Sequence, residues 1–432
     1  MSEDATLDDF TETTEEAESG EDGVRELFGL GEIPADWSIE PLADIAEIIP
    51  GNSPPSSTYN EKGEGLPFFQ GNSEFGHFHP EADTWCSEPR KEAEKNDVLM
   101  SIRAPVGDLN IADRNCCIGR GIAALRPKIL NGFYLFYNLA ERKPWLSRLA
   151  TGSTFKSVTK SDLQLLDIPV PTLEEQREIA TVIYSVDRAI EKTEEVINQT
   201  ERVETGLLQN LFNGEHLDCE YREEPTLGEI PDHWDSAPMG EVCDITMGSS
   251  PKSKYYNESG DGLPFFQANN EFGLRNPTHD RWCSNPVKTA DEGDSLMTIR
   301  GTYVGQMNIA DRKCCIGRGL AGISAGDSLS AEYLYHFLRR RERYVKSIAI
   351  GSTFDSVNTN DLENLLVAIP PISEQKEIAE TLRSIQDYIV SSRDNIRQLK
   401  ILKQGLMQDL LSGTVRTTDT NIEVPEEIAQ HG

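Results

Sequence analysis

The stretch YNEKGEGLPFFQGNSEFG at residues 59–76 returns at residues 256–273 as YNESGDGLPFFQANNEFG, with 14 of 18 positions identical. Shorter strings repeat at spacings of 197 to 199 residues: GEIPxxW (from Gly31 and Gly228), WC (Trp85 and Trp282), CCIGRG (Cys116 and Cys314), GSTF (Gly152 and Gly351) and EQ(R/K)EIA (Glu175 and Glu374). A period near 200 is far longer than the roughly 20 to 50 residues of solenoid and propeller repeats. The chain is therefore predicted to contain two copies of one unit, each the size of a domain.

Each copy combines a larger part, rich in short β-type runs broken by Gly and Pro, with a smaller helical part. Residues 97–103 and 109–112 favour strands, and Gly132 to Leu149 is a candidate helix. The expected fold class is mixed α/β: two strand-rich domains separated by long helices, in a pseudo-two-fold internal repeat. The expected boundaries are 1–23 for an acidic disordered tail, 24–172 for domain 1, 173–213 for its helix, 214–371 for domain 2, 372–413 for the second helix and 414–432 for another disordered tail.

The helical parts carry a coiled-coil pattern. Prolines at residues 168–171 and 369–371 bar helix upstream, and downstream the apolar residues recur every seven positions in two stripes that include Ile190 and Ile389. One buried amphipathic helix in each domain is the alternative. If the two helices pair, the second runs back towards domain 1, so the pair is antiparallel. About 39 helical residues at ~1.5 Å each give roughly 58 Å, between one and two turns of B-DNA at ~34–36 Å per turn.

The acidic composition allows two different interpretations of the function. The chain has 41 basic and 73 acidic side chains, a net charge of −32, which taken alone argues against nucleic-acid binding. Either the partner is not nucleic acid, or the acid is a solvated coat of the kind that salt-loving archaea use. The eight cysteines lack CxxC spacing and are expected to be reduced, buried strand residues. Without a signal peptide or a long apolar run, a soluble cytoplasmic protein is expected.

The order of the repeated motifs resembles the DNA-specificity subunits of Type I restriction-modification enzymes. In that family a string similar to (I/L)PxPxxxEQxxIA introduces each long helix, as at residues 168–180 and 369–379 here. A GST(F/V) element precedes it, as at residues 152–163 and 351–362, and the GEIPxxW openings at Gly31 and Gly228 match as well. The resemblance covers about residues 30 to 413.

The resemblance implies a function and a set of partners. Each target-recognition domain is expected in the major groove of double-stranded DNA, where it reads half of a bipartite target. The helices are expected to set the spacing and to bind two methyltransferase subunits, with motor-nuclease subunits joining that core. The resemblance implies a non-catalytic subunit, with S-adenosylmethionine, ATP and Mg on the partner subunits and no metal of its own. Consistently, the sequence lacks GxGxxG, Walker and amino-methyltransferase motifs.

Most candidate DNA contacts are side chains that bind guanine, adenine or phosphate and that lie in repeated loops. His77 and Arg275 are candidates because they lie where the two copies diverge, as differing half-sites would require. In copy 1 they are Gln70, Asn72, Ser73, His77, Arg103, Arg120, Ser153, Thr154 and Lys156; in copy 2 they are Gln267, Asn269, Asn270, Arg275, Arg300, Tyr303, Arg318, Ser352 and Thr353. Each has a structural alternative: the amide loops as hydrogen-bonded turns, Arg120 and Arg318 in buried ion pairs, the Ser and Thr residues as caps. Phe68, Phe69 and their twins are expected in the core rather than under stacked bases.

Similar loops are expected to read similar bases, and antiparallel helices invert the two reading surfaces. The target is therefore predicted to be partly palindromic, with identical bases where the loops agree. Two rival functions stay open at this point: a restriction endonuclease or methyltransferase with an unrecognised active site, and a coiled-coil scaffold without a DNA role. Methyl transfer by the chain alone would favour the first rival. The duplicated large domains argue against the second, because a scaffold needs only the helices.

Overall fold

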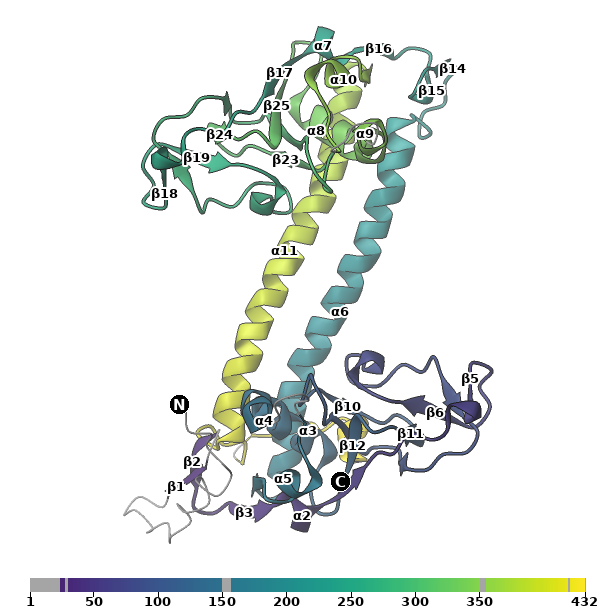
Figure 1. Cartoon of the computed structure of the whole chain (residues 1–432), viewed down its shortest axis with the longest axis vertical. Helices are drawn as coiled ribbons and strands as arrows, with labels where there is room; N and C mark the ends of the chain where they lie inside the picture. The colour runs from purple at the N-terminus through teal and green to yellow at the C-terminus, as the bar shows by residue number, and fades with distance from the viewer. Residues whose placement is uncertain (1–23, 28–29, 150–156, 350–354, 419, 432) are drawn as a thin grey trace. The chain divides into compact units, whose positions relative to one another are not determined.

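The computed structural model describes residues 24–27, 30–149, 157–349, 355–418 and 420–431. The chain divides into unit 1, residues 1–193 with 396–432, and unit 2, residues 194–395. Each unit therefore contains one strand-rich domain together with parts of the two long helices, α6 (Leu173–Phe212) and α11 (Ile372–Leu411) (Figure 1). The repeat predicted from the sequence is present in the structure as two units with the same order of elements.

Domain 1 is built on two small sheets. A four-stranded sheet has the order β10-β9-β12-β4 and a five-stranded sheet the order β5-β7-β6-β11-β8. The strands are short: β4 (Ala46–Pro50), β5 (Tyr59–Asn60), β6 (Leu66–Phe69), β7 (Trp85–Cys86), β8 (Glu92–Ala93), β9 (Val98–Ser101), β10 (Leu109–Ile111), β11 (Cys116–Ile118) and β12 (Ile122–Pro127). All pairs are antiparallel except β6 with β11. Two antiparallel pairs complete the domain: β1 with β2 (Val24–Leu27, Gly31–Pro34), which are neighbours in sequence, and β3 with β13 (Ser38–Pro41, Asp167–Val170), which join the beginning and the end of the domain.

Domain 2 repeats this topology strand for strand. Its sheets have the orders β17-β25-β22-β23 and β18-β20-β19-β24-β21. The strands are β14 (Tyr221–Glu224), β15 (Gly228–Pro231), β16 (Asp235–Pro238), β17 (Cys243–Met247), β18 (Tyr256–Asn257), β19 (Leu263–Phe266), β20 (Trp282–Cys283), β21 (Thr289–Ala290), β22 (Ser295–Thr298), β23 (Met307–Ile309), β24 (Cys314–Ile316), β25 (Leu320–Ala325) and β26 (Leu366–Ile369). The single parallel pair is again the counterpart, β19 with β24.

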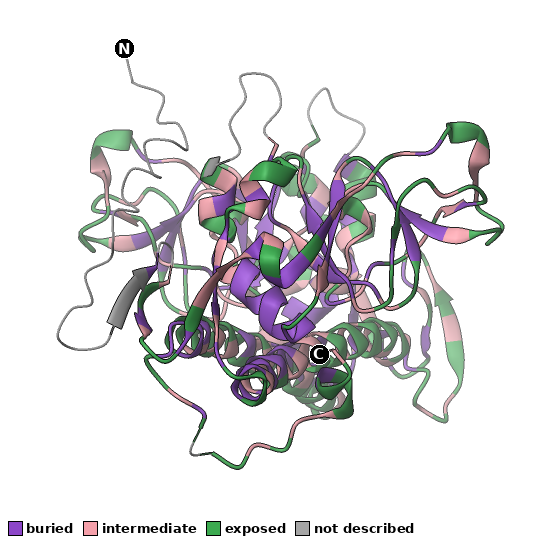
Figure 2. Ribbon diagram, turned by 90° about the horizontal axis from the view of Figure 1, so that it is seen from below, coloured by how far each residue is buried: buried purple, intermediate pink, exposed green. Residues whose placement is uncertain are grey.

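Short helices cover the four-stranded sheets and supply much of the core. In domain 1 they are α2 (Leu42–Ile45), α3 (Gly132–Glu141), α4 (Lys143–Leu149) and α5 (Lys160–Gln164); in domain 2 they are α7 (Met239–Val242), α8 (Ala331–Arg340), α9 (Glu342–Ala349) and α10 (Thr359–Glu363). The predicted helix over 132–149 is therefore split between α3 and α4. The Asn131 side chain caps α3 by accepting from the Phe133 and Tyr134 N–H groups. Residues of α3 from Gly132 to Asn138 are buried, and buried residues also gather on the strands beneath such helices (Figure 2).

The adjacent cysteines and the phenylalanine doublets are core residues, as predicted. Cys116 and Cys117 are fully buried in β11, as are Cys314 and Cys315 in β24. Burial raises the pKa of the Cys116 thiol to about 12, so the thiol is neutral near pH 7. Phe68 and Phe69 are also buried, which excludes them as exposed stacking platforms. The signature strings LPFF and CCI therefore build the centre of each five-stranded sheet.

The two long helices contact each other within each unit with opposite polarity. In unit 1, Met407 and Leu410 near the end of α11 join the core that holds Ile179 and Ile183 near the start of α6, and Lys403 Nζ lies 2.7 Å from an Asp187 carboxylate oxygen. In unit 2 the end of α6 contributes Leu207, Leu211 and Phe212 to the core that contains Ile378 and Leu382 at the start of α11. The helices are therefore paired, as the heptad pattern predicted, and antiparallel, as the order of the domains along the chain predicted. None of the described helices combines the length and the apolar composition that a bilayer-spanning segment needs.

The C-terminal segment differs from the sequence-based expectation of a loose tail over 414–432. Residues 414–418 and 420–431 are described, and they include helix α12 (Glu426–Ala429). Ile428 is fully buried in the unit 1 core, and its carbonyl oxygen accepts from Asn131 Nδ2 at 2.7 Å. The His431 ring packs against the Phe133 ring in a tilted arrangement, with 4.7 Å between the ring centroids. The expectation was wrong. It rested on the low number of apolar residues in the segment, but these few residues pack against the start of α3.

Candidate nucleic-acid interface

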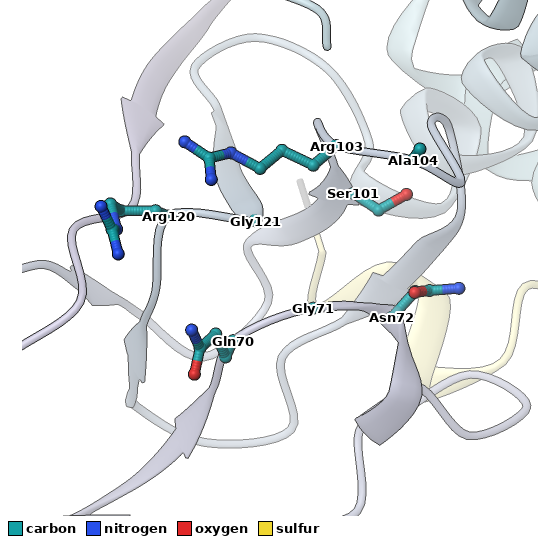
Figure 3. A pocket seen from close by; sticks show the side chains of 8 residues that line it. All are labelled: Gln70, Gly71, Asn72, Ser101, Arg103, Ala104, Arg120 and Gly121. Atoms are coloured by element: carbon teal, nitrogen blue, oxygen red, sulfur yellow. The ribbon is translucent and has the colours of Figure 1, made fainter. Parts of the chain in front are cut away.

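The strongest candidate for a ligand surface is an open hollow on domain 1, lined by loops that follow short strands. Gln70 follows β6, Arg103 lies just beyond β9, and Arg120 lies between β11 and β12. Gly71, Asn72, Ser101, Ala104 and Gly121 complete the lining. Figure 3 shows the polar ends of Gln70, Arg103 and Arg120 extending towards the same side of these loops. Three of the side chains predicted from repeated strings thus converge on one surface.

Backbone hydrogen bonds fix this hollow. The Gly119 N–H donates to the Phe69 carbonyl oxygen at 2.8 Å, and the Gly121 N–H donates to the Gln70 carbonyl oxygen at 3.2 Å. A Cβ on Gly121 would lie 2.3 Å from that Gln70 oxygen, so the close approach requires glycine. The GRG part of CCIGRG therefore packs one loop against the other, and Arg120 between the two glycines extends into solvent.

Domain 2 repeats the same construction. The Gly317 N–H donates to the Phe266 carbonyl oxygen at 2.7 Å, and a Cβ on Gly319 would lie 2.4 Å from the Gln267 carbonyl oxygen. Arg300 lies just beyond β22 and Arg318 lies between β24 and β25. The chain thus carries the arrangement of two arginines and a glutamine twice, once in each domain.

The four arginines of these surfaces are exposed and available to a ligand. Arg103, Arg120, Arg300 and Arg318 are all exposed, and the described part of the chain brings no carboxylate oxygen into ion-pair range of any of them. The alternative of a buried ion pair for Arg120 and Arg318 is therefore wrong. Exposed guanidinium groups without a protein carboxylate are the groups that bind phosphate oxygens or the O6 and N7 atoms of guanine.

The amide-rich loops serve partly as structural turns. In domain 1 the Glu74 carboxylate accepts from the Gly71 N–H at 3.1 Å and from Ser73 Oγ at 2.8 Å, and Asn72 Nδ2 donates to an Asp108 oxygen at 2.7 Å. In domain 2 the Glu271 carboxylate accepts from the N–H groups of Gln267 and Ala268 at 3.3 and 3.1 Å. The Gln70 side chain and the Asn270 side chain are exposed, while Asn72, Gln267 and Asn269 are half-buried. The interpretation of these loops as hydrogen-bonded turns is therefore confirmed, and base reading by their amides stays a prediction.

The profile of one known protein family matches two segments of the chain. The family described as "Type I restriction modification DNA specificity domain" matches residues 34–202 and again residues 231–400. The chain belongs to this family. The two matches correspond to the two copies of the repeat, so each copy is one specificity domain.

Relatives of this specificity-domain protein match over nearly its whole length. A Methanocaldococcus jannaschii protein named as the type I restriction enzyme MjaX specificity subunit is 28% identical, over 90% of this chain and 95% of the relative. The MjaVIII specificity subunit of the same organism is 23% identical, over 93% and 98%. A chain from a solved type I restriction-modification system has a TM-score of 0.54 at 26% identity, over 89% and 99%. The crystal structure of an S subunit from M. genitalium gives 0.63 at 16% identity, over 87% and 96%, and shares the fold.

Other residues of this family member that were predicted to contact DNA are not among those that line the hollow of domain 1 or their equivalents in domain 2. Arg275 is mostly buried and its guanidinium donates to the Glu332 carboxylate at 2.6 Å, so the expectation of a free Arg275 for DNA is wrong. His77 is exposed and packs edge-on against Phe78 at 4.6 Å. Tyr303 is 52% exposed in the loop after Arg300. The remaining predicted residues lie outside the described part of the chain: Ser153, Thr154, Lys156, Ser352 and Thr353.

The repeated EQ and GEIPxxW strings form a buried joint between each domain and its helix. In unit 1 the Glu175 carboxylate accepts from Trp37 Nε1 at 3.1 Å and from Arg416 Nε at 2.6 Å. Gln176 Oε1 accepts from the Asn131 N–H at 2.8 Å, and Gln176 Nε2 donates to the Pro171 carbonyl oxygen at 2.9 Å. These bonds fix the start of α6 to Trp37 near the beginning of domain 1 and to Asn131 at the start of α3.

Unit 2 has the same joint with one difference. Glu374 accepts from Trp234 Nε1 at 2.8 Å and contacts His233 Nε2 at 3.0 Å, and Gln375 accepts from the Ser330 N–H at 2.8 Å. No arginine takes the place that Arg416 has beside Glu175, among the contacts of the residues described around Glu374. The family motif therefore encodes the attachment of the helix, and the candidate reading surface lies elsewhere, in the repeated loops.

Sequence reasoning missed Asp108, Lys143 and Arg416. Asp108 and Lys143 contact each other, and Asp108 contacts Asn72 at the edge of the hollow. A signal was present, since Asp108 aligns with Gln306 and Lys143 with Glu342 in the second copy. Arg416 carried no such signal, because its partners Asp36 and Glu175 are distant in sequence and the string around it is not repeated.

Proposed function

We propose that this chain is the DNA-specificity subunit of a type I restriction-modification complex, in which each domain reads one half of a bipartite target. The observation that carries the proposal is the hollow of domain 1 with Arg103, Arg120 and Gln70. In domain 2 the equivalent loops carry Arg300, Arg318 and Gln267 and are held by the equivalent backbone contacts. Membership of the DNA-specificity family, with the family profile matched twice, supports the same conclusion.

The chemistry of the hollow suits the major groove. Arginine pairs with O6 and N7 of guanine, and the amides of glutamine and asparagine pair with N6 and N7 of adenine. The two arginines also provide positive charge on a chain whose net charge is −32, which favours local contact with phosphates over general attraction to DNA. We therefore expect the affinity of the free subunit to be low and the affinity of the assembled complex to be high.

The long helices are the proposed docking site for two methyltransferase subunits, and they set the spacing between half-sites. Val203 of α6 and Leu402 of α11 occupy equivalent positions of the repeat and are 56% and 51% exposed. A pair of equivalent exposed apolar side chains supports docking of two copies of one partner, because identical partners need equivalent surfaces. Motor-nuclease subunits are expected to join this core.

We further propose that the chain is non-catalytic and acts in the cytoplasm, and that S-adenosylmethionine, ATP and Mg bind partner subunits. The rival function, a methyltransferase with an unrecognised site, predicts methyl transfer by the chain alone. Incubation of the purified chain with labelled S-adenosylmethionine and DNA is expected to give no incorporation, and incorporation would overturn this part of the proposal.

The direct test of DNA reading removes the arginines of one hollow at a time. In the complex with methyltransferase subunits, Arg103→Ala is expected to weaken binding to the cognate duplex by about 1–3 kcal/mol if it contacts a base. A phosphate contact would instead weaken binding to all sequences and reduce the salt slope by about 0.9. Arg114→Ala is the matched control, since Arg114 is an exposed arginine of the same domain that is already paired with Asp113 at 2.6 Å. Equal affinity of the Arg103 and Arg114 variants would refute the assignment.

A further inference from the structure

The two copies of the reading loop differ in how they hold a shared asparagine. Asn72 and Asn269 occupy the same position of the repeat. Asn72 Nδ2 donates to an Asp108 carboxylate oxygen at 2.7 Å. The residue equivalent to Asp108 is Gln306, and among the described residues of domain 2 no hydrogen bond joins its side chain to Asn269. Identical asparagines therefore lie in different hydrogen-bonding environments.

The Asp108 carboxylate is itself firmly placed. The Asp108 N–H donates to Ser101 Oγ at 2.9 Å, and Ser101 Oγ donates to the Pro105 carbonyl oxygen at 2.8 Å, with Ser101 only 1% exposed. The Ser101 N–H in turn donates to the Asp108 carbonyl oxygen at 2.8 Å. Lys143 Nζ contacts the second carboxylate oxygen. The lysine offsets the negative charge that would otherwise repel nearby phosphates.

A fixed carboxylate determines which end of the Asn72 amide meets a ligand. A carboxylate only accepts hydrogen bonds, so the amide nitrogen must face Asp108. Asn72 is one of the residues that line the hollow, and its carbonyl oxygen is then the end of the amide that is left for a ligand. An oxygen acceptor in the major groove is matched by N6 of adenine or N4 of cytosine, and not by the acceptors of guanine or the O4 of thymine.

We propose that Asp108 is a specificity-positioning residue, which makes domain 1 require an amino-bearing base, adenine or cytosine, opposite Asn72. This inference rests on the proposed DNA-reading function. Domain 2 lacks the requirement, because the Gln306 amide can either donate or accept and Glu342 stands where domain 1 has Lys143. The half-sites are thus expected to differ in stringency at this one position, although the asparagine is the same.

The test transplants the residue of one copy into the other, in the intact complex with methyltransferase subunits. Binding is measured to duplexes that carry each of the four base pairs at every target position, and Arg103→Ala and Arg300→Ala identify the half-site that each domain contacts. Asp108→Gln is expected to reduce discrimination at one position of the domain 1 half-site by roughly 5- to 100-fold, with the other positions unchanged. The double change Gln306→Asp with Glu342→Lys is expected to raise discrimination at the equivalent position in the domain 2 half-site.

Asp113→Asn is the matched control, because it removes one carboxylate from the same domain without touching Asn72. Unchanged discrimination in Asp108→Gln, or a uniform loss of affinity for all duplexes, overturns the inference and leaves the proposed function standing. If instead the wild-type complex binds all duplexes equally, the proposed function itself fails. A discrimination change confined to the domain 2 half-site also contradicts the role given to Asp108.

Discussion

The buried joint at the start of α6 gives a prediction whose size follows from the structure. Glu175 is 1% exposed and accepts hydrogen bonds from Trp37 and from Arg416. Glu374, its equivalent in unit 2, is 23% exposed and contacts Trp234 together with the half-exposed His233. Replacing each glutamate by alanine removes the same chemical group from two joints that differ in burial and in the charge of the partner.

The expected losses of stability differ accordingly. Breaking a buried ion pair by removing one partner costs about 3–5 kcal/mol, and in Glu175→Ala the Trp37 N–H also loses its acceptor. The remaining partner, Arg416, is 31% exposed and keeps its two hydrogen bonds to Asp36, at 3.0 and 2.8 Å. Both facts place the expected cost near the lower end of that range, about 3 kcal/mol. Glu374→Ala leaves one buried N–H without a partner, for which about 1–2 kcal/mol is expected. The difference between the two variants is the quantity to measure.

Hydrogen exchange of the intact chain in a urea series resolves the two joints, since peptides around Trp37 and Trp234 report on separate units. Glu175→Ala is expected to lower the opening free energy around Trp37 by at least about 1 kcal/mol more than Glu374→Ala lowers it around Trp234. Glu175→Gln, which keeps the shape and one acceptor, is expected to fall between wild type and Glu175→Ala. Equal losses in the two alanine variants would refute the reasoning that burial and Arg416 set the strength of the first joint.

Three further outcomes are expected. The double variant Ile190→Asp, Ile389→Asp places charges at positions that are 3% and 4% exposed, and it is expected to abolish co-purification with the methyltransferase subunit. The control variant Asn198→Asp, on the exposed face of α6, is expected to keep co-purification. Survival of the complex in the double variant would contradict the pairing of the helices. Thermal stability is expected to rise with KCl into the molar range, where the Debye length falls to about 3 Å, and a flat melting temperature from ~0.1 M upwards removes the interpretation of the acid as a salt-adapted coat. Burial lowers the pKa of His431 to about 4. The contribution of His431 to docking of the C-terminal segment is therefore fully present above the ordinary histidine pKa of about 6.5 and is lost as the pH falls towards 4. Protease cleavage after residue 413 is expected to increase over that pH window in the wild type but not in His431→Asn.

The repeat and the heptads made most of the fold predictable. Two copies of LPFF and CCIGRG indicated the same sheet twice, and the apolar stripes through Ile190 and Ile389 indicated helix pairing. These features rest on local periodicity and self-similarity, which one sequence displays directly. Docking of the C-terminal segment was not predictable, because it depends on Ile428 and Arg416 meeting residues about 240 to 380 positions away.

The candidate site was predictable in its residue types and less so in its geometry. Arginines in repeated loops pointed to Arg103 and Arg120, and the structure brings them together with Gln70. Arg275 was selected because the copies diverge around it, yet that divergence serves an internal ion pair with Glu332. Asp108 was overlooked because a carboxylate is not expected beside DNA. The role that we propose for Asp108 depends on a contact with Asn72 that sequence spacing does not reveal.

We propose that this chain gives a methyltransferase its target, and mapping of methylated bases tests this proposal most directly. The chain and its methyltransferase subunit are expressed together in a host without other DNA methylation, and every modified adenine in the genome is recorded. We expect one bipartite motif with a fixed spacer, whose half-sites are partly inverted copies. One half of the motif is expected to change when Arg103 is replaced by alanine, and the other half when Arg300 is replaced. A single undivided motif, or methylation whose sequence is unaffected by either change, would contradict the proposal.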